Sequence, residues 1–362
     1  WIFLINLPIG IAAMLMVVSF LHIPHTPRKS KIDWMGSAAI VVAVVPLLLV
    51  AESGRDWGWD SSLSISMYVT GVIGIISFIL IERKMGDDAI LPLKLFKSIT
   101  FSMSTGIGVI VGVGMFGGML TLPLILQIVK GASPTEAGLL MIPMTIGMMT
   151  ASMGSGIITG RTGKYKIFMV VGTAMMTASY LYFAQMKYDW ELWQFSIGMV
   201  VMGLGLGQLM QTLTIAAQNA VEPRDIGVAT SSATFFRQMG GTAGVAVFLS
   251  ILFATLAEKG SWIGEQIKSV LMAKPELLTL PENAILKDTQ TGGIADMVAT
   301  DSSFLQTISR EISEPILIAF TEAGVTVFST AAAVIFVGFI LTLFVKEVPL
   351  RQMSGVAAKA EE

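Results

Sequence analysis

Gly156-Ile-Ile-Thr-Gly160-Arg161-Thr-Gly163-Lys164-Tyr-Lys166 is a short basic stretch between two long apolar runs, residues 137–160 and 167–186. Each run is long enough to cross a bilayer as a helix, which needs about 20 mainly apolar residues. The few residues between the runs leave room only for a tight hairpin turn. Because basic residues collect in cytoplasmic loops, the three cations of this turn predict that it lies on the cytoplasmic side.

The rest of the chain repeats this pattern. Of its 362 residues, 54% are hydrophobic and 13% are charged, whereas a soluble domain carries about 25% charged residues. Runs of this length predict spanning helices rather than core helices of a soluble protein. The sequence therefore predicts an all-α polytopic membrane bundle of nine transmembrane helices, at residues 1–21, 34–51, 63–81, 99–129, 137–160, 167–186, 192–221, 226–257 and 315–345.

Several classes of function are disfavoured by composition. A net charge of -2 gives no indication of a nucleic-acid partner, and the absence of cysteine excludes disulfides and thiolate metal sites. His22 and His25 lie in one loop without further ligands nearby, so no metal site is expected. Gly203-Leu-Gly205-Leu-Gly207 lies inside an apolar run and lacks the strand that precedes a dinucleotide-binding loop, so it predicts helix packing. We expect neither an enzyme nor a bound cofactor.

The basic residues fix the predicted orientation. If the loops alternate between the two sides, fourteen Lys and Arg residues fall on one side and three on the other, and the richer side is cytoplasmic. The richer set is Arg28, Lys29, Lys31, Arg83, Lys84, Lys94, Lys97, Arg161, Lys164, Lys166, Arg224, Lys346, Arg351 and Lys359, and the other set is Arg55, Lys130 and Lys187. The C-terminus is therefore predicted to be cytoplasmic.

The one long outer segment comprises residues 258–314. Long loops cross the membrane whatever their charge, so this segment does not disturb the orientation. Residues 261–272 and 302–312 are predicted to form short amphipathic helices, and Lys274-Pro and Leu280-Pro should break the chain between them. The segment could also be a simple soluble cap.

Each residue of the basic turn has a predicted role. Gly156 and Gly160 would present a bare helix face that lets two helices approach closely. Gly163 would take a positive φ and reverse the chain. Arg161 and Lys164 would bond the last carbonyls of the preceding helix, where the helix dipole favours cations. Such bonds could form and break as a gate, or the turn could serve only as a positive anchor.

Charged residues inside spanning segments are functional candidates, because burying them is costly. Arg237 interrupts one run and Glu322 another, while Glu52 ends a third. Arg237 could either lie half buried or extend to the inner boundary, and the two acids fit the outer boundary. Possible substrate contacts are polar or aromatic side chains in apolar helices, which could equally serve helix packing: Phe116, Gln127, Gln208, Gln211 and Phe236.

Longer motifs resemble one family. The basic turn is similar to the signature loop of the major facilitator superfamily, although Gly160 stands where that loop usually has Asp. The fourteen-helix drug:proton antiporters of this superfamily (QacA/EmrB type), in particular actinobacterial members, have stretches similar to five in this chain. These are Trp1-Ile-Phe-Leu-Ile-Asn-Leu-Pro-Ile-Gly10, Leu91-Pro-Leu-Lys-Leu-Phe96, Ala132-Ser-Pro-Thr-Glu-Ala-Gly138, Phe235-Phe-Arg237-Gln-Met-Gly-Gly241 and Lys346-Glu-Val-Pro-Leu-Arg351.

The resemblance implies a proton-coupled efflux transporter in the cell membrane, which exports small amphipathic compounds by alternating access. Its partners would be the lipid bilayer, the substrate, protons and five preceding helices that are missing. Residues 1–21 would be the last helix of the N-terminal bundle and residues 22–98 two linker helices with their loops. Residues 99–345, with the outer loop 258–314, would be the second six-helix bundle, and residues 346–362 a cytoplasmic tail.

Two alternatives stay open. With its first five helices missing, the chain would be a C-terminal portion that is not expected to transport alone, because alternating access needs two bundles. It could then be a non-transporting truncated product. It could also be a membrane partner or sensor protein built on the same bundle.

Overall fold

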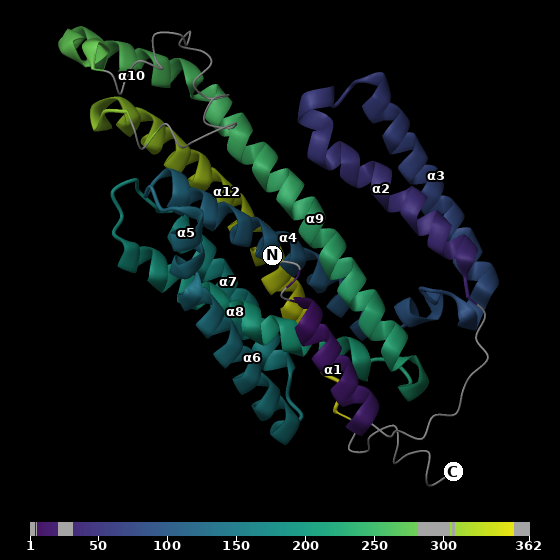
Figure 1. Ribbon diagram of the computed structural model, residues 1–362. Helices are drawn as coiled ribbons and strands as arrows, with labels where there is room; N and C mark the ends of the chain where they lie inside the picture. Colours follow the sequence, from purple (N-terminus) through teal and green to yellow (C-terminus); the bar gives the residue numbers. More distant parts are fainter. Residues whose placement is uncertain (1–3, 5, 21–31, 281–304, 306–307, 351–362) are drawn as a thin grey trace, which may run out of the picture.

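The computed structural model describes residues 4, 6–20, 32–280, 305 and 308–350 (Figure 1), and its regular elements are all helices. Eight of the described helical segments are long and apolar enough to cross a membrane. The all-α fold is thus as predicted. The ninth predicted helix, at residues 1–21, is described only as α1 (Asn6–Phe20), whose 15 residues fall short of that length and include no buried residue.

Six of the spans pack into one bundle. They are α4 (Ile99–Ile128), α6 (Ile142–Thr162), α7 (Lys166–Phe183), α8 (Leu192–Asn219), α9 (Ile226–Glu258) and α12 (Arg310–Phe344). α4 packs along α9, α6 along α8, and α12 against α4 and α7. Aromatic rings fill the centre, where Phe183 and Phe328 lie 5.1 Å apart between ring centroids and are both fully buried.

Glycines set how closely these helices approach. A Cβ on Gly203 or Gly207 of α8 would collide with the backbone carbonyl of Met144 or Met148 on α6. A Cβ on Gly205 would lie 2.8 Å from the carbonyl of Gly172 on α7. Lipid tails are as apolar as the side chains, so burying a side chain between two helices brings no hydrophobic gain in a membrane. Small residues instead let the helix backbones approach closely and make van der Waals contacts. The prediction that Gly203, Gly205 and Gly207 serve helix packing is confirmed.

The apolar run 137–160 was predicted as one spanning helix, and residues 134–162 do form one candidate span, but the helix is interrupted at Met141. α5 (Pro134–Leu140) ends before Met141, and α6 begins at Ile142 with Pro143 in its first turn. Pro143 has no N–H to donate to a carbonyl of the preceding turn, so a continuous helix would lose that hydrogen bond. α5 has its own start signal, because Ser133 and Glu136 form a capping box.

A helical hairpin stands beside the bundle, with α2 (Trp34–Trp57) alongside α9 and α3 (Ser62–Met85) on the side of α2 away from α9 (Figure 1). The C-terminal end of α3 is tied to the chain that leads into α4. There the Glu82 carboxylate is 1% exposed and accepts a 3.0 Å hydrogen bond from the N–H of Leu91. The lead contains two short 3-10 turns, η1 (Gly86–Asp88) and η2 (Leu93–Lys97).

The long segment after α9 begins with α10 (Gly260–Ala273), which confirms the amphipathic helix predicted at residues 261–272. Its apolar side buries Ile263 and Ile267. The helix ends at Lys274, before η4 (Pro275–Thr279), as the Lys-Pro pair predicted. Five of the eleven residues of the second predicted helix, 302–312, lie outside the described residues, and its last three belong to α12, which begins at Arg310.

Candidate functional site

The basic turn joins α6 to α7 with the backbone geometry that the sequence predicted. Gly163 has a φ of 72°, in the left-handed region that side chains disfavour. Its N–H donates a 2.8 Å hydrogen bond to the carbonyl of Thr159, which closes the end of α6. The prediction of a positive φ at Gly163 is confirmed, and a larger residue would strain the turn.

The packing role predicted for Gly156 and Gly160 is wrong. Within the described residues, a Cβ on Gly160 would meet no atom within 4 Å, and one on Gly156 would meet only the Gln211 side chain, at 3.6 Å or more. The face of α6 that packs against the bundle instead carries the buried residues Met144 and Gly147 in its first half. Gly156 and Gly160 lie on another side of the same helix, so the closest approach to α8 occurs elsewhere.

Arg161 and Lys164 also differ from the prediction. Both side chains are exposed, and within the described part of the chain neither makes a hydrogen bond or an ion pair. The Thr162 hydroxyl, rather than a cation, bonds a carbonyl of the last turn of α6, that of Ile158, at 2.7 Å. The two cations are therefore free for other contacts in this conformation.

The segment after α12 fastens this turn to the rest of the bundle. We call residues 345–350 the C-terminal strap. One carboxylate oxygen of Glu347 accepts hydrogen bonds from the N–H groups of Tyr165, at 2.9 Å, and Lys166, at 3.1 Å. The first N–H groups of a helix have no partner within the helix and carry partial positive charge. Glu347 therefore caps the beginning of α7.

The cap is reciprocal. The Lys166 ammonium at the beginning of α7 donates a 2.8 Å hydrogen bond to the carbonyl of Leu343, in the last turn of α12. Carbonyls at a helix end have no partner within the helix and favour a cation. The strap after α12 thus supplies the carboxylate that caps the beginning of α7, and α7 supplies the ammonium that caps the end of α12.

Further hydrogen bonds complete this junction, and those of Asn219 connect α8 to it. The buried Tyr165 hydroxyl accepts a 3.0 Å hydrogen bond from the N–H of Val348. At the end of α8, the Asn219 amide donates to the carbonyls of Val348, at 2.8 Å, and Pro349, at 3.1 Å. Burial raises the pKa of Tyr165 above its ordinary value, so the phenol stays neutral at physiological pH. A hollow of about 690 Å³ separates the strap from Arg161 and Lys164.

The sequence offered no signal for Glu347, which lies in the stretch predicted as the start of a cytoplasmic tail. Its partner residues are 181 and 182 positions away along the chain. An acid, which the signature loop lacks at Gly160, is thus present nearby in space, although it comes from the segment after α12, far away along the chain.

The two predicted intramembrane charges have different surroundings. Glu322 on α12 forms an ion pair with Lys259, which lies between α9 and α10. It therefore lies beside the end of α9 from which the long loop begins. Arg237 is half buried in α9, where α4 crosses so closely that a Cβ on Gly112 would collide with the Arg237 carbonyl. No ion pair joins it to a described residue.

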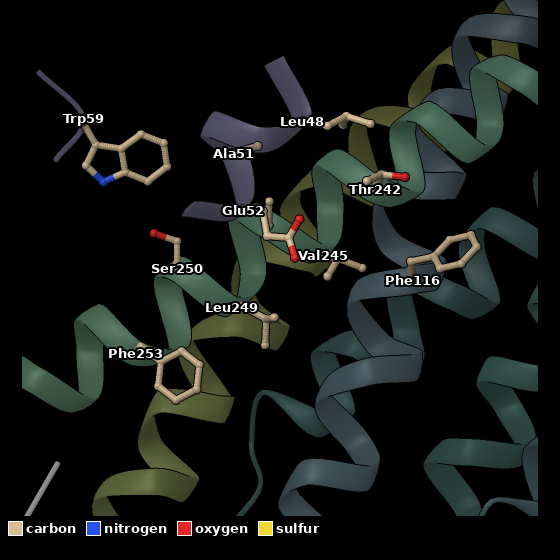
Figure 2. A pocket seen from close by; sticks show the side chains of 11 residues that line it. Leu48, Ala51, Glu52, Trp59, Phe116, Thr242, Val245, Leu249, Ser250 and Phe253 are labelled. Atoms are coloured by element: carbon tan, nitrogen blue, oxygen red, sulfur yellow. The ribbon is translucent and has the colours of Figure 1, made fainter. Parts of the chain in front are cut away.

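The structure does not bring the predicted substrate contacts together. The amides of Gln127 and Gln208 bond carbonyls of their own helices, those of Pro123 and Leu204. Phe236 packs edge-on against Phe96. Gln211 lines a shallow groove with methionines of α6 and α8. Only Phe116 lines a cavity that also contains a charged group, the Glu52 carboxylate (Figure 2).

Comparison with known proteins adds independent information. The family model described as Major Facilitator Superfamily matches residues 1–245. A tetracycline resistance determinant of Streptomyces rimosus is 32% identical over 87% of this chain and 91% of its own length. The multidrug transporter MdtP of Bacillus subtilis is 31% identical over the whole of this chain and 68% of its own length.

An uncharacterized transporter of the same type from Mycobacterium tuberculosis is 34% identical over 97% of this chain. The alignment covers 47% of that protein, so the chain spans about half the length of this relative.

Proposed function

Because the chain belongs to the major facilitator superfamily, we propose that it is part of an efflux transporter that exports small amphipathic compounds in exchange for protons. The observation that carries this proposal is the similarity, over 87% of the chain, to a protein named as a tetracycline resistance determinant. A second relative along the whole chain is named as a multidrug transporter. The described helices give the apolar bundle that such transport requires.

The cytoplasmic junction between α6, α7 and α12 supports a gating role in alternating access. Its contacts join helix ends rather than helix cores, so they can open without unpacking the bundle. Arg161 and Lys164 face a hollow beside the strap and have no described partner, which leaves them free to bond in a second conformation. We infer that the signature turn and the C-terminal strap together form the cytoplasmic latch of the transport cycle.

Within this proposal, residues 99–345 are the second bundle, residues 22–98 the linker helices, residues 1–21 the last helix of the first bundle and residues 346–362 the tail. The basic loops and the C-terminus face the cytoplasm, and the membrane is the cell membrane. A complete cycle uses two bundles around a central site, so the tests below use the protein as its gene encodes it.

The orientation leads to the first prediction. Thr162 lies in the basic turn and Ser261 at the start of α10, and both are exposed in a chain without cysteine. We expect Ser261→Cys to react with a membrane-impermeant maleimide on intact cells, and Thr162→Cys to react only after the cells are opened. The opposite pattern would reverse the orientation and would assign the latch to the outer side.

The latch leads to the second prediction. Gly163→Leu should reduce efflux of ethidium and tetracycline at unchanged expression, because leucine disfavours the φ of 72°. Arg161→Ala should reduce it as well, because it removes a cation with which the turn can bond in its other state. Efflux is measured as loss of intracellular probe after energisation, and a protonophore should abolish it.

Gly160→Ala is the control for these variants, since a Cβ there meets no atom within 4 Å. Equal efflux in Arg161→Ala, Gly163→Leu and the control would reduce the turn to an orientation signal. No efflux by the unaltered protein, or efflux that persists with the protonophore, would contradict proton-coupled export.

A further inference from the structure

A pocket of about 490 Å³ lies where α4 turns into α5 and α8 begins, at the opposite end of α6 from the latch. Its wall contains one cation, Lys130, and one anion, Glu136. The rest of the wall is apolar and consists of Gly131, Ala132, Leu139, Leu140 and Leu192. The volume lies within the range of about 300–1,000 Å³ that small-molecule sites occupy.

The Lys130 ammonium is held in place but not neutralised. It donates a 2.6 Å hydrogen bond to the carbonyl of Tyr188 and lies 5.8 Å from the centre of the Phe195 ring. An ammonium has three donors, and Lys130 forms no ion pair within the described part of the chain. Partial burial lowers the pKa of Lys130, because it removes water from the charged group, and an anion beside it would compensate that loss.

The Glu136 carboxylate is fixed on the same pocket wall. One of its oxygens accepts a 2.9 Å hydrogen bond from the N–H of Ser133, as part of the capping box of α5. The other oxygen has no partner among the described residues, and no hydrogen bond or ion pair joins Glu136 to Lys130. The pocket therefore presents a cation and an anion that do not compensate each other.

The pocket lies at the level where a membrane has its headgroups. No charged residue occurs between Lys97 and Lys130, so this lysine marks the end of the apolar span. Tyr and Trp concentrate at the boundary between lipid and water, and Tyr188, Trp190 and Trp193 lie in or next to the loop before α8.

An exposed apolar face extends from the pocket along α6. The spacing of three and four residues puts its side chains on one side of that helix, and their exposed fractions lie between 46% and 69%. They are Ile142, Ile146, Met149 and Met153. Leu139, in the wall of the pocket, is itself 59% exposed. A molecule with its polar part in the pocket could thus lay an apolar chain along α6.

These features match a phospholipid with two opposite charges in its headgroup. Lysine binds phosphate as a point charge. A carboxylate accepts hydrogen bonds, which the primary ammonium of an ethanolamine headgroup donates and the trimethylated choline headgroup cannot donate. A headgroup with a negative charge alone would be repelled by Glu136.

We propose that this pocket binds one molecule of phosphatidylethanolamine from the adjoining membrane leaflet, with its phosphate at Lys130, its ammonium at Glu136 and an acyl chain along α6. The lipid would connect the turn between α4 and α5 to the beginning of α8. Lipid binding at this place is independent of which compound the chain transports.

The test is thermal unfolding of the purified, delipidated protein, as its gene encodes it, during titration with dioctanoyl phosphatidylethanolamine or dioctanoyl phosphatidylcholine. A ligand that binds only the folded state raises the melting temperature with its concentration, which gives an apparent Kd. We expect the ethanolamine lipid to bind about fivefold more tightly, the effect of one partly exposed charge pair.

The variants address each charge separately. Glu136→Gln removes the charge and keeps the capping box, which also accepts Gln at this position. It should weaken binding of phosphatidylethanolamine about fivefold and leave phosphatidylcholine within about twofold. Lys130→Gln should weaken both lipids, because both contain the phosphate.

Two exposed residues near the pocket but outside its wall provide matched controls. Glu191→Gln alters the capping acid of α8, and Lys187→Gln alters a cation of the preceding loop. Both should leave the binding of either lipid within about twofold. The melting temperature without lipid shows whether each variant is folded. If Lys130→Gln does not fold, the comparison of the two lipids in Glu136→Gln still decides.

Three results would overturn the proposal. The first is no stabilisation of the unaltered protein by either lipid. The second is an unchanged preference for phosphatidylethanolamine in folded Glu136→Gln. The third is equally tight binding of glycerophosphoethanolamine, which has the same headgroup without acyl chains and would identify the occupant as a soluble zwitterion. Efflux is not measured, so these outcomes are independent of the proposed function.

Discussion

Gly207→Leu is expected to prevent accumulation of folded protein in the membrane. A Cβ at this position would collide with the backbone carbonyl of Met148 and lie 2.9 Å from the N–H nitrogen of Ser152. A flexible side chain could move aside, but the α6 backbone cannot do so without breaking its own hydrogen bonds. The larger leucine would separate α6 from α8 along their whole contact, since Gly203 makes the same approach one turn earlier.

The energetic cost is large relative to the stability of the fold. Overpacking a tight interface costs about 1–3 kcal/mol and more where backbones meet, and natural proteins are stable by only about 5–15 kcal/mol. We expect the variant to elute as aggregate in fluorescence-detected size-exclusion chromatography, or to melt well below the unaltered protein.

Gly160→Ala, on the open side of the same α6 helix, is the matched control and should behave like the unaltered protein. If Gly207→Leu and Gly160→Ala gave the same elution profile and melting temperature, α6 and α8 would not meet as described.

Glu347→Ala is expected to impair efflux while the protein still reaches the membrane. The substitution leaves the N–H groups of Tyr165 and Lys166 without their acceptor. Loss of a helix cap costs about 1 kcal/mol, which corresponds to a roughly fivefold shift in the equilibrium between a closed and an open latch. A transport cycle that depends on this equilibrium should slow by a similar factor.

The conservative variant separates gating from simple stability. Glu347→Gln retains an oxygen that can accept both hydrogen bonds but loses the negative charge that favours the beginning of α7. Its efflux should therefore lie between that of Glu347→Ala and that of the unaltered protein. The rate at which Thr162→Cys is labelled in opened cells should rise in Glu347→Ala, because the turn is then less firmly held.

Glu222→Ala provides the matched control, since Glu222 is an exposed acid whose side chain pairs only with the neighbouring Arg224 among the described residues. Labelling and efflux that are the same in Glu347→Ala and Glu222→Ala would show that the strap takes no part in gating.

The sequence alone determined the features that depend on local composition and turn chemistry. The bounds predicted for the helices of the bundle agree with the observed ones within a few residues at α4, α7, α8 and α9. A spanning helix needs only a sufficient apolar length, which is visible without knowing its neighbours. The positive φ at Gly163 and the helix α10 were predictable because they depend on the residues of one short stretch of the chain.

Only the tertiary structure decided which faces meet. Gly156 and Gly160 have the spacing of a packing motif, yet the packed face of α6 contains Gly147, because register between helices depends on all the side chains along the contact. Glu347 reaches α7, and Glu52 lies opposite α9, across distances in the chain that no local pattern records. A carboxylate has the same sequence signature whether it caps a distant helix, lines a cavity or remains in water, and the fold alone selects among these surroundings.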